Sequence, residues 1–382
     1  MKRPIRIISQ TLHFYDKIEK NHRGKRGDNL TKVTEIREEL KKRNLDALLI
    51  TNPYNRRYLT GFTGSAGVVL ITPEDALFLT DFRYVEQAEQ EAKGYTIIEH
   101  EPQLVNELKN QVKRLGINRL GFEAEHVTMA EYNEFKEHLE CELSPTTGIV
   151  ETLRMIKTDE EIAIIQKAAE IADKAFEHIL DVIKPGVREI EIANELEYVM
   201  RKLGATQSSF DTIVASGVRS SLPHGVASEK KIEAGELVTL DFGALYKGYC
   251  SDITRTVAVG NVSDELKEIY HIVLEAQERG VAGIKPGMTG MEADALTRDF
   301  ITENGYGKQF GHSTGHGIGL EIHEGPALSP KSNTLLKKNM VVTVEPGIYI
   351  PNVGGCRIED DIVLTENGNE RLTRSTKQWI QL

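Results

Sequence analysis

The chain has 382 residues, 40% of them hydrophobic and 27% charged, which is enough for two domains with separate hydrophobic cores. Its net charge of −11 excludes a typical nucleic-acid-binding protein, and no stretch approaches the roughly 18 apolar residues of a membrane span. Three scattered cysteines, Cys141, Cys250 and Cys356, favour a reducing compartment over a disulfide framework. We therefore expect a cytoplasmic protein.

Residues 1–29 differ from the rest of the chain. They are rich in lysine and arginine and lack a clear hydrophobic period. We expect a basic N-terminal extension that is either disordered or not translated in the native protein.

Residues 30–150 alternate between helical and strand patterns, which predicts a smaller α/β N-terminal domain. An amphipathic helix begins near Thr31, and Asn52–Asn55 is predicted to be a turn. The other elements expected are strands at 46–51, 67–71, 76–79 and 119–122 and helices at 84–92, 103–115 and 129–139.

Residues 151–382 form the second predicted domain and contain an internal repeat. Thr158 and Glu161 form a capping box that opens a long amphipathic helix. The segment Ile183–Gly186 recurs as Ile284–Gly287, an offset of 101 residues, and each copy precedes a helix. Two copies are too few for a solenoid, so we expect them to pack around a pseudo-twofold axis.

Each repeat leads to a hairpin that carries two acidic residues. In the first, the midpoint between Asp241 and Asp252 puts the turn centre between Tyr246 and Lys247, and in that register the two aspartates face each other with Cβ atoms about 5 Å apart. In the second, Glu345 and Glu359 are centred on Asn352 and can oppose each other in the same way.

Carboxylates that face each other among apolar neighbours repel, unless one is protonated or a cation lies between them. Four such acids are available, whereas Asp360 and Asp361 are expected to be flanking charges only. The glycine-rich segment 311–324 adds three histidines, His312, His316 and His323, of which one could complete a metal site. This oxygen-rich set suits Mn²⁺ or Co²⁺, and two ions roughly 3.5–4 Å apart would use all of it.

These motifs resemble the aminopeptidase P and prolidase branch of the pita-bread metallopeptidases. The resemblance covers residues 31–382 and is strongest from 209 to 364. It is carried by Leu240-Asp241-Phe242-Gly243, Ser251-Asp252, His316-Gly317-Ile318-Gly319, Val344-Glu345-Pro346-Gly347 and Arg357-Ile358-Glu359-Asp360. The resemblance implies an α/β (α+β) protein with a pita-bread catalytic domain after a smaller α/β domain.

The resemblance also implies roles for individual residues. The five metal ligands would be Asp241, Asp252, His316, Glu345 and Glu359, which would hold two divalent ions. The ions are expected to be Mn²⁺, with Co²⁺, Zn²⁺ or Fe²⁺ as alternatives. The substrate contacts would be His224, His312, His323 and Arg357, and the catalytic residues Glu345, His323 and His224.

The expected substrates are peptides with proline at the second position, and the expected assembly is a homodimer. Our first expectation is an aminopeptidase P that removes the first residue from longer Xaa-Pro peptides. The alternative is a prolidase restricted to Xaa-Pro dipeptides. A non-catalytic peptide-binding relative is a remote alternative, because such relatives lose metal ligands and all five are present here.

Overall fold

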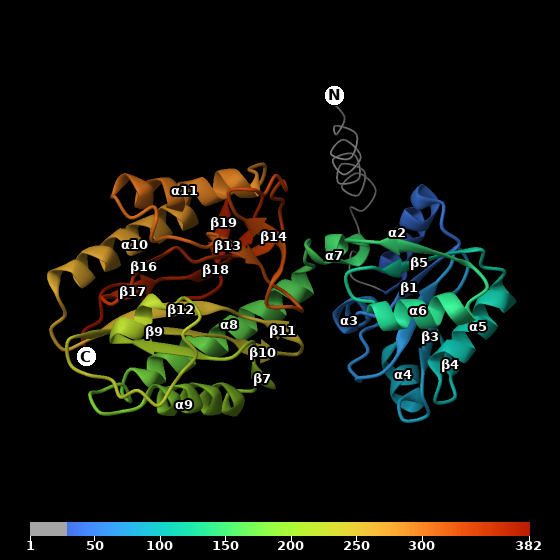
Figure 1. Cartoon of the computed structure of the whole chain (residues 1–382), viewed down its shortest axis with the longest axis horizontal. Helices are drawn as coiled ribbons and strands as arrows, with labels where there is room; N and C mark the ends of the chain where they lie inside the picture. Colours follow the sequence, from blue (N-terminus) through green and yellow to red (C-terminus); the bar gives the residue numbers. More distant parts are fainter. Residues whose placement is uncertain (1–28) are drawn as a thin grey trace. The chain divides into compact units, whose positions relative to one another are not determined.

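The computed structural model describes residues 29–382. The predicted extension therefore lies outside the described residues, apart from Asn29, the first residue of helix α2. The chain divides into two compact units between Leu153 and Arg154 (Figure 1). Over residues 29–382, no helix has the length and apolar character needed to cross a bilayer.

The first unit is built on one mixed six-stranded sheet with the order β4-β3-β2-β1-β5-β6. Its strands are β1 (Ala47–Ile50), β2 (Val68–Ile71), β3 (Ala76–Thr80), β4 (Thr96–Glu99), β5 (Arg119–Glu123) and β6 (Glu142–Thr146). Its helices are α2 (Asn29–Arg43), α3 (Pro53–Thr60), α4 (Val85–Glu91), α5 (Leu104–Leu115), α6 (Met129–His138) and α7 (Ile149–Arg154), which crosses the division. Apolar residues of α5 and α6, including Leu108 and Phe135, pack with β1, β3 and β5 in one buried cluster.

The predicted turn at Asn52–Asn55 is wrong. Asn52 is instead the N-cap of α3, and its side chain accepts hydrogen bonds from the backbone N–H groups of Tyr54 and Asn55. Pro53 occupies the first helical turn, where its missing N–H group costs nothing. An Asn-Pro pair is compatible with a turn and with a helix start, and the residues after it decide between them.

The second unit contains helices and strands in two similar halves. Its helices are α8 (Asp159–Ile179), α9 (Glu189–Lys202), α10 (Asp264–Gly283) and α11 (Gly290–Glu303), with a 3₁₀ helix η1 (Gly217–Ser221). The strands of the first half are β7 (Gln207–Ser208), β8 (Ile213–Ser216), β9 (Glu236–Phe242), β10 (Ala244–Tyr246), β11 (Tyr249–Cys250) and β12 (Ile253–Val259). Those of the second half are β13 (Gly315–Gly317), β14 (Glu324–Leu328), β15 (Val341–Val344), β16 (Gly347–Ile350), β17 (Gly354–Arg357), β18 (Asp360–Leu364) and β19 (Asn369–Arg371).

The predicted internal repeat is confirmed by matching helices and bridges. Helices α9 and α11 have 14 residues each and begin after Arg188 and Thr289, which hold corresponding places in the two halves. Arg188 makes an isolated bridge to Lys231, and Thr289 makes the equivalent bridge to Leu335. In Figure 1, α8 and α9 cover one side of the central sheets and α10 and α11 cover the other.

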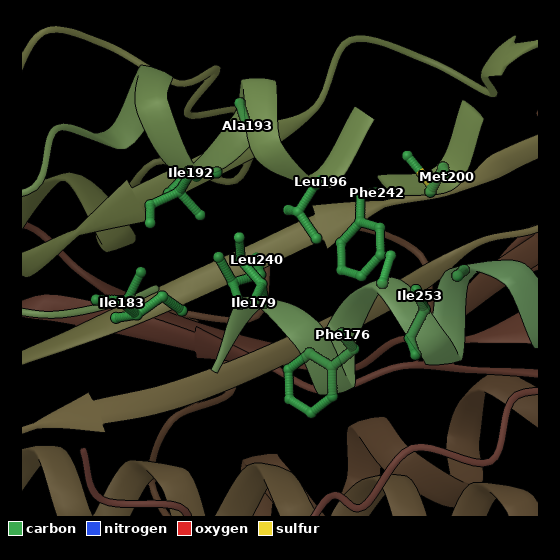
Figure 2. Packing of buried hydrophobic residues seen from close by; sticks show 14 of the residues in the cluster. Phe176, Ile179, Ile183, Ile192, Ala193, Leu196, Met200, Leu240, Phe242 and Ile253 are labelled. Atoms are coloured by element: carbon green, nitrogen blue, oxygen red, sulfur yellow. The ribbon is translucent and has the colours of Figure 1, made fainter. Parts of the chain in front are cut away.

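The core of the first half lies between its helices and its sheet. Phe176 and Ile179 of α8 and Leu196 of α9 meet Leu240 and Phe242 of β9 in a fully buried cluster (Figure 2). This packing fixes β9 from its apolar side, and Asp241 lies between two of these anchored residues. The alternation of strand residues therefore turns Asp241 to the opposite face.

The register of the first hairpin differs from the prediction. Asp241 pairs with Thr254, so Asp252 is its diagonal neighbour and not its direct partner. Lys247 and Gly248 both have positive φ values, 49° and 86°, which is typical of a two-residue hairpin turn and moves its centre one residue along. A shift of two residues in the pairing keeps both aspartates on one face, so they still converge.

The register of the second hairpin is confirmed. Val344 pairs with Asp360 and Gly347 pairs with Arg357, which places Glu345 opposite Glu359 between these two pairs. Asn352, at the predicted centre, has a positive φ of 64°.

Candidate metal centre

The five predicted ligands come from both halves of the second unit. Asp241 belongs to β9, Asp252 immediately precedes β12, and His316 belongs to β13. Glu345 follows β15, and Glu359 joins β17 to β18. The repeat therefore supplies one acidic hairpin to each side of the site.

The structure brings these side chains together. Ligand atoms of Asp252, His316 and Glu359 lie within 4.8 Å of one another. The His316 Nε2 atom is 3.3 Å from Glu345 Oε1 and 3.7 Å from Asp252 Oδ2. Asp241 is close enough to Asp252 and Glu359 for its charge to raise the pKa of both carboxyl groups.

Burial and mutual repulsion make this group of carboxylates costly without a cation. Burial, reinforced by the charge of Glu359, holds the pKa of Asp252 well above its ordinary value. Burial and the charge of Glu345 do the same for the pKa of Glu359. Burial opposes the charge of Glu345 too, but its hydrogen bond with His316 prevails and lowers its pKa to about 2.

The donor set fits divalent cations. Three oxygen atoms, Asp241 Oδ1, Asp252 Oδ1 and Glu359 Oε1, are buried and have no hydrogen-bond partner within residues 29–382. Buried polar atoms in native proteins are almost always satisfied, so unpaired carboxylate oxygens that converge point to an ion as their partner. Carboxylates with one imidazole suit Mn²⁺-like ions better than thiolate-seeking ones.

A layer of hydrogen bonds behind the predicted ligands fixes their orientation. Thr254 Oγ1 donates to Glu359 Oε2 at 2.8 Å, and the backbone N–H group of Asp252 donates to Asp361 Oδ2 at 2.9 Å. Asp361 is fully buried, and so is Asp360, which pairs with Arg255 at 2.8 Å. The expectation that Asp360 and Asp361 are only flanking charges is therefore wrong.

Arg357 begins a second chain of hydrogen bonds, which runs through Tyr349 to His312. Its Nη1 atom donates to the Tyr349 hydroxyl at 2.7 Å, so that hydroxyl donates in turn to His312 Nε2 at 2.8 Å. His312 Nδ1 then donates to the Ser313 carbonyl at 2.8 Å. Burial lowers the pKa of His312, which agrees with a neutral ring in this arrangement.

The remaining predicted substrate residues, His323 and His224, lie beside the ligand cluster. The rings of His323 and His316 have centroids 4.5 Å apart. Burial lowers the pKa of His323, and so do the nearby charges of His316 and, more weakly, His224. His224 is exposed on the loop after η1, where Arg357 Nη1 donates to the carbonyl of the preceding Pro223 at 3.1 Å.

Sequence reasoning missed Tyr349, Thr254 and Asp361. Tyr349 occupies an apolar β-strand and carries no motif of its own. Asp361 offers one signal, since an acidic residue inside the buried run Asp360–Leu364 needs a partner. Thr254 offers none, because threonine is common in strands.

Comparison with known proteins assigns both units. Residues 32–156 match the family model described as creatinase/prolidase N-terminal domain, and residues 163–366 match metallopeptidase family M24. The Xaa-Pro dipeptidase of Pyrococcus horikoshii is 44% identical over 91% of this chain and 98% of its own length.

Two solved structures extend this likeness. The Xaa-Pro dipeptidase of Bacillus anthracis is 62% identical, with a TM-score of 0.92 over 93% of this chain and all of that one. The X-Pro aminopeptidase of Thermotoga maritima is 43% identical, with a TM-score of 0.84 over 92% of this chain and 99% of that one. The predicted resemblance and fold class are thereby confirmed, and the protein is a hydrolase that belongs to metallopeptidase family M24.

Proposed function

We propose that this protein is a prolidase, an Xaa-Pro dipeptidase that works with two divalent metal ions. The carrying observation is its similarity, along nearly their entire length, to relatives named Xaa-Pro dipeptidase, and the five predicted ligands, which lie close together, support it. These relatives favour the dipeptidase over the aminopeptidase P that we expected first.

Asp241, Asp252, His316, Glu345 and Glu359 would hold the ions. When bound, such ions make a water molecule acidic enough to supply a nucleophile near neutral pH. The oxygen-rich ligand set supports Mn²⁺, with Co²⁺, Zn²⁺ and Fe²⁺ as further candidates to be separated by metal replacement.

The chain's own residues would then guide the proton and the charge. Glu345 would accept a proton from the attacking water and deliver it to the proline nitrogen as the bond breaks. His323 would donate a hydrogen bond to the carbonyl oxygen as that oxygen gains negative charge. His224, on the neighbouring loop, would orient the same end of the substrate.

The proline nitrogen of the scissile bond carries no hydrogen, so the site must recognise proline by shape. His312 and Arg357 would contribute through the arrangement that they share with Tyr349. His312 Nε2 already accepts a hydrogen bond from that hydroxyl, so we propose that His312 positions Tyr349 and Arg357 and does not contact the substrate itself.

An aminopeptidase P remains the second candidate function. It is favoured by the 43% identity to the X-Pro aminopeptidase of Thermotoga maritima. The two functions share the same chemistry and differ in whether the site admits residues beyond the proline.

The deciding experiment compares Gly-Pro with Gly-Pro-Ala as substrates of the Mn²⁺-loaded protein, with products separated by chromatography. We expect release of glycine from the dipeptide and little from the tripeptide. Gly-Ala serves as the control for proline recognition. Faster cleavage of Gly-Pro-Ala would favour the aminopeptidase, and cleavage of neither would overturn the proposal.

We also propose a homodimer in the cytoplasm. The three free cysteines support a reducing compartment. Light scattering coupled to gel filtration measures the mass of the assembly, and a monomer at assay concentration would reject the dimer.

A further inference from the structure

A buried ion cluster lies outside the metal centre, at the first residues of the second unit. The Glu324 side chain, 6% exposed, receives Arg154 Nη2 at 2.5 Å and Lys157 Nζ at 2.6 Å. The same Arg154 atom also lies 2.7 Å from Glu321 Oε2. The side chains of Arg154 and Lys157 are 2% and 1% exposed, so both cations are buried against Glu324, whereas the Glu321 side chain is 30% exposed and lies at the edge of the cluster.

The turn that carries His323 is folded around the Glu324 carboxylate. Glu321 donates its backbone N–H group to Glu324 Oε2 at 3.4 Å, and Gly319 donates to the Glu321 carbonyl at 3.1 Å. Gly319 lies so close that a Cβ atom there would be 2.4 Å from Glu324 Oε1. The carboxylate therefore fills the centre of the turn that links His316 to His323.

The backbone of Lys157 is itself held by Asn339, in the turn that precedes β15. The backbone N–H group of Lys157 donates to the Asn339 carbonyl at 2.9 Å, and Asn339 Nδ2 returns a bond to the Lys157 carbonyl at 3.0 Å. Met155 packs over the next residue of the turn, where a Cβ atom on Gly325 would lie 3.0 Å from its sulfur. The segment 154–157 is thus a fixed support for the turn.

We infer that Arg154 and Lys157, acting through Glu324, are positioning residues that hold the His323 ring beside His316. None of the three touches the predicted ligands in any contact described above. His323 directly follows Ile322 in the turn and precedes Glu324, so any movement of the carboxylate moves its backbone. The inference rests on the proposed role of His323 toward substrate.

The test uses the double variant Lys157→Met/Glu324→Gln, which removes one cation and one anion and leaves Arg154 paired with Glu321. We expect bound metal, measured by elemental analysis, to stay at the wild-type level. We expect kcat/KM for Gly-Pro to fall at least about tenfold, mainly through kcat, because small displacements of a catalytic group are costly.

The same double change is then made in a His323→Ala background, where we expect less than about a twofold further loss. In a matched His224→Ala background the full loss should persist. The inference would be overturned by equal losses in the wild-type, His323→Ala and His224→Ala backgrounds, or by no loss in the wild-type background. Should the double variant fail to fold, Arg154→Lys, which keeps the charge but replaces the guanidinium group by a shorter ammonium group, enters the same cycle.

An NMR measurement that does not depend on catalytic turnover separates this inference from the proposed function. In the metal-free protein, the ring ¹H–¹³C signal of His323, assigned by its loss in His323→Ala, should shift in the double variant while that of His224 stays in place. An unmoved His323 signal would overturn the positioning role. A shifted signal in a protein that cleaves no Xaa-Pro peptide would retain it and reject the function.

Discussion

Arg357 Nη2 donates a 2.5 Å hydrogen bond to Asp241 Oδ2 and so joins strand β17 of the second half to strand β9 of the first. Both side chains are buried, at 4% and 13% exposed. Burial opposes the charge on Arg357, but Tyr349 and Asp241 outweigh it and hold its pKa well above the ordinary value. This ion pair ties together the two acidic hairpins.

Replacing Arg357 by methionine should therefore destabilise the metal-free protein strongly. Removing one partner of a buried ion pair typically costs about 3–5 kcal/mol in the free energy of unfolding. With Mn²⁺ bound, the ions supply positive charge beside Asp241, so the loss should be smaller. Urea unfolding with EDTA and with excess Mn²⁺ measures the difference, and equal losses in both conditions would contradict this account.

Asp252→Asn should stabilise the metal-free protein while removing metal. The wild-type carboxylate is buried beside Glu359 and Asp241, whereas the amide keeps its shape without its charge. Removing this buried charge should therefore raise the free energy of unfolding in EDTA at neutral pH.

Two measurements check the Asp252→Asn prediction. Elemental analysis should find less bound Mn²⁺ than in the wild type, and added Mn²⁺ should no longer raise Tm. Glu366→Gln, on the surface, is the control for loss of one carboxylate and should change neither. Full metal content in Asp252→Asn would remove Asp252 from the ligand set.

Glu345→Gln tests the proposed proton acceptor. Loss of a general acid–base group typically lowers turnover by a factor of about 10²–10⁴, so we expect kcat for Gly-Pro to fall at least a hundredfold. Bound metal is measured in the same samples, since Glu345 is also a predicted ligand. An unchanged kcat at unchanged metal content would refute the role.

The ion cluster of Glu324, Arg154 and Lys157 should make the stability of the protein sensitive to acid. Burial alone would raise the pKa of Glu324, but Lys157 and Arg154 outweigh it and hold the pKa below its ordinary value of 4.5. A carboxyl group with a lowered folded-state pKa stabilises the protein above its unfolded-state pKa, and this contribution disappears as pH falls through the folded-state value.

In EDTA, the wild-type free energy of unfolding should therefore decline more steeply below about pH 4.5 than that of Lys157→Met/Glu324→Gln. Urea titrations at a series of pH values give both curves. Parallel curves would mean that Glu324 is not held in its charged form by the two cations.

Local patterns in the sequence predict most elements and the four acidic residues that converge with His316, but not the role of Asp361 behind them. The register of the second hairpin is predicted correctly from the midpoint between Glu345 and Glu359, because these two residues are direct partners and Asn352 between them has a positive φ. The same midpoint rule misplaces the centre of the first hairpin by one residue, because Asp241 and Asp252 are diagonal neighbours and the turn falls at Lys247, which has a positive φ that its residue type does not suggest. Because β9 pairs with β12, Asp241 and Asp252 converge even though their predicted register is wrong by two residues.

Contacts between distant residues could not be predicted in the same way. Arg154 and Glu324 are 170 residues apart, and His312 and Tyr349 are 37 apart. Such pairs depend on how the two halves pack, which neither periodicity nor spacing encodes. The same limit explains why the buried partners of Asp360 and Asp361 were missed.

Anomalous diffraction from crystals grown with Mn²⁺ tests the central claim most directly. We expect two peaks, both within bonding distance of Asp252 and Glu359, with Asp241 on one ion and His316 and Glu345 on the other. A single peak, or peaks that these five residues do not coordinate, would contradict the account.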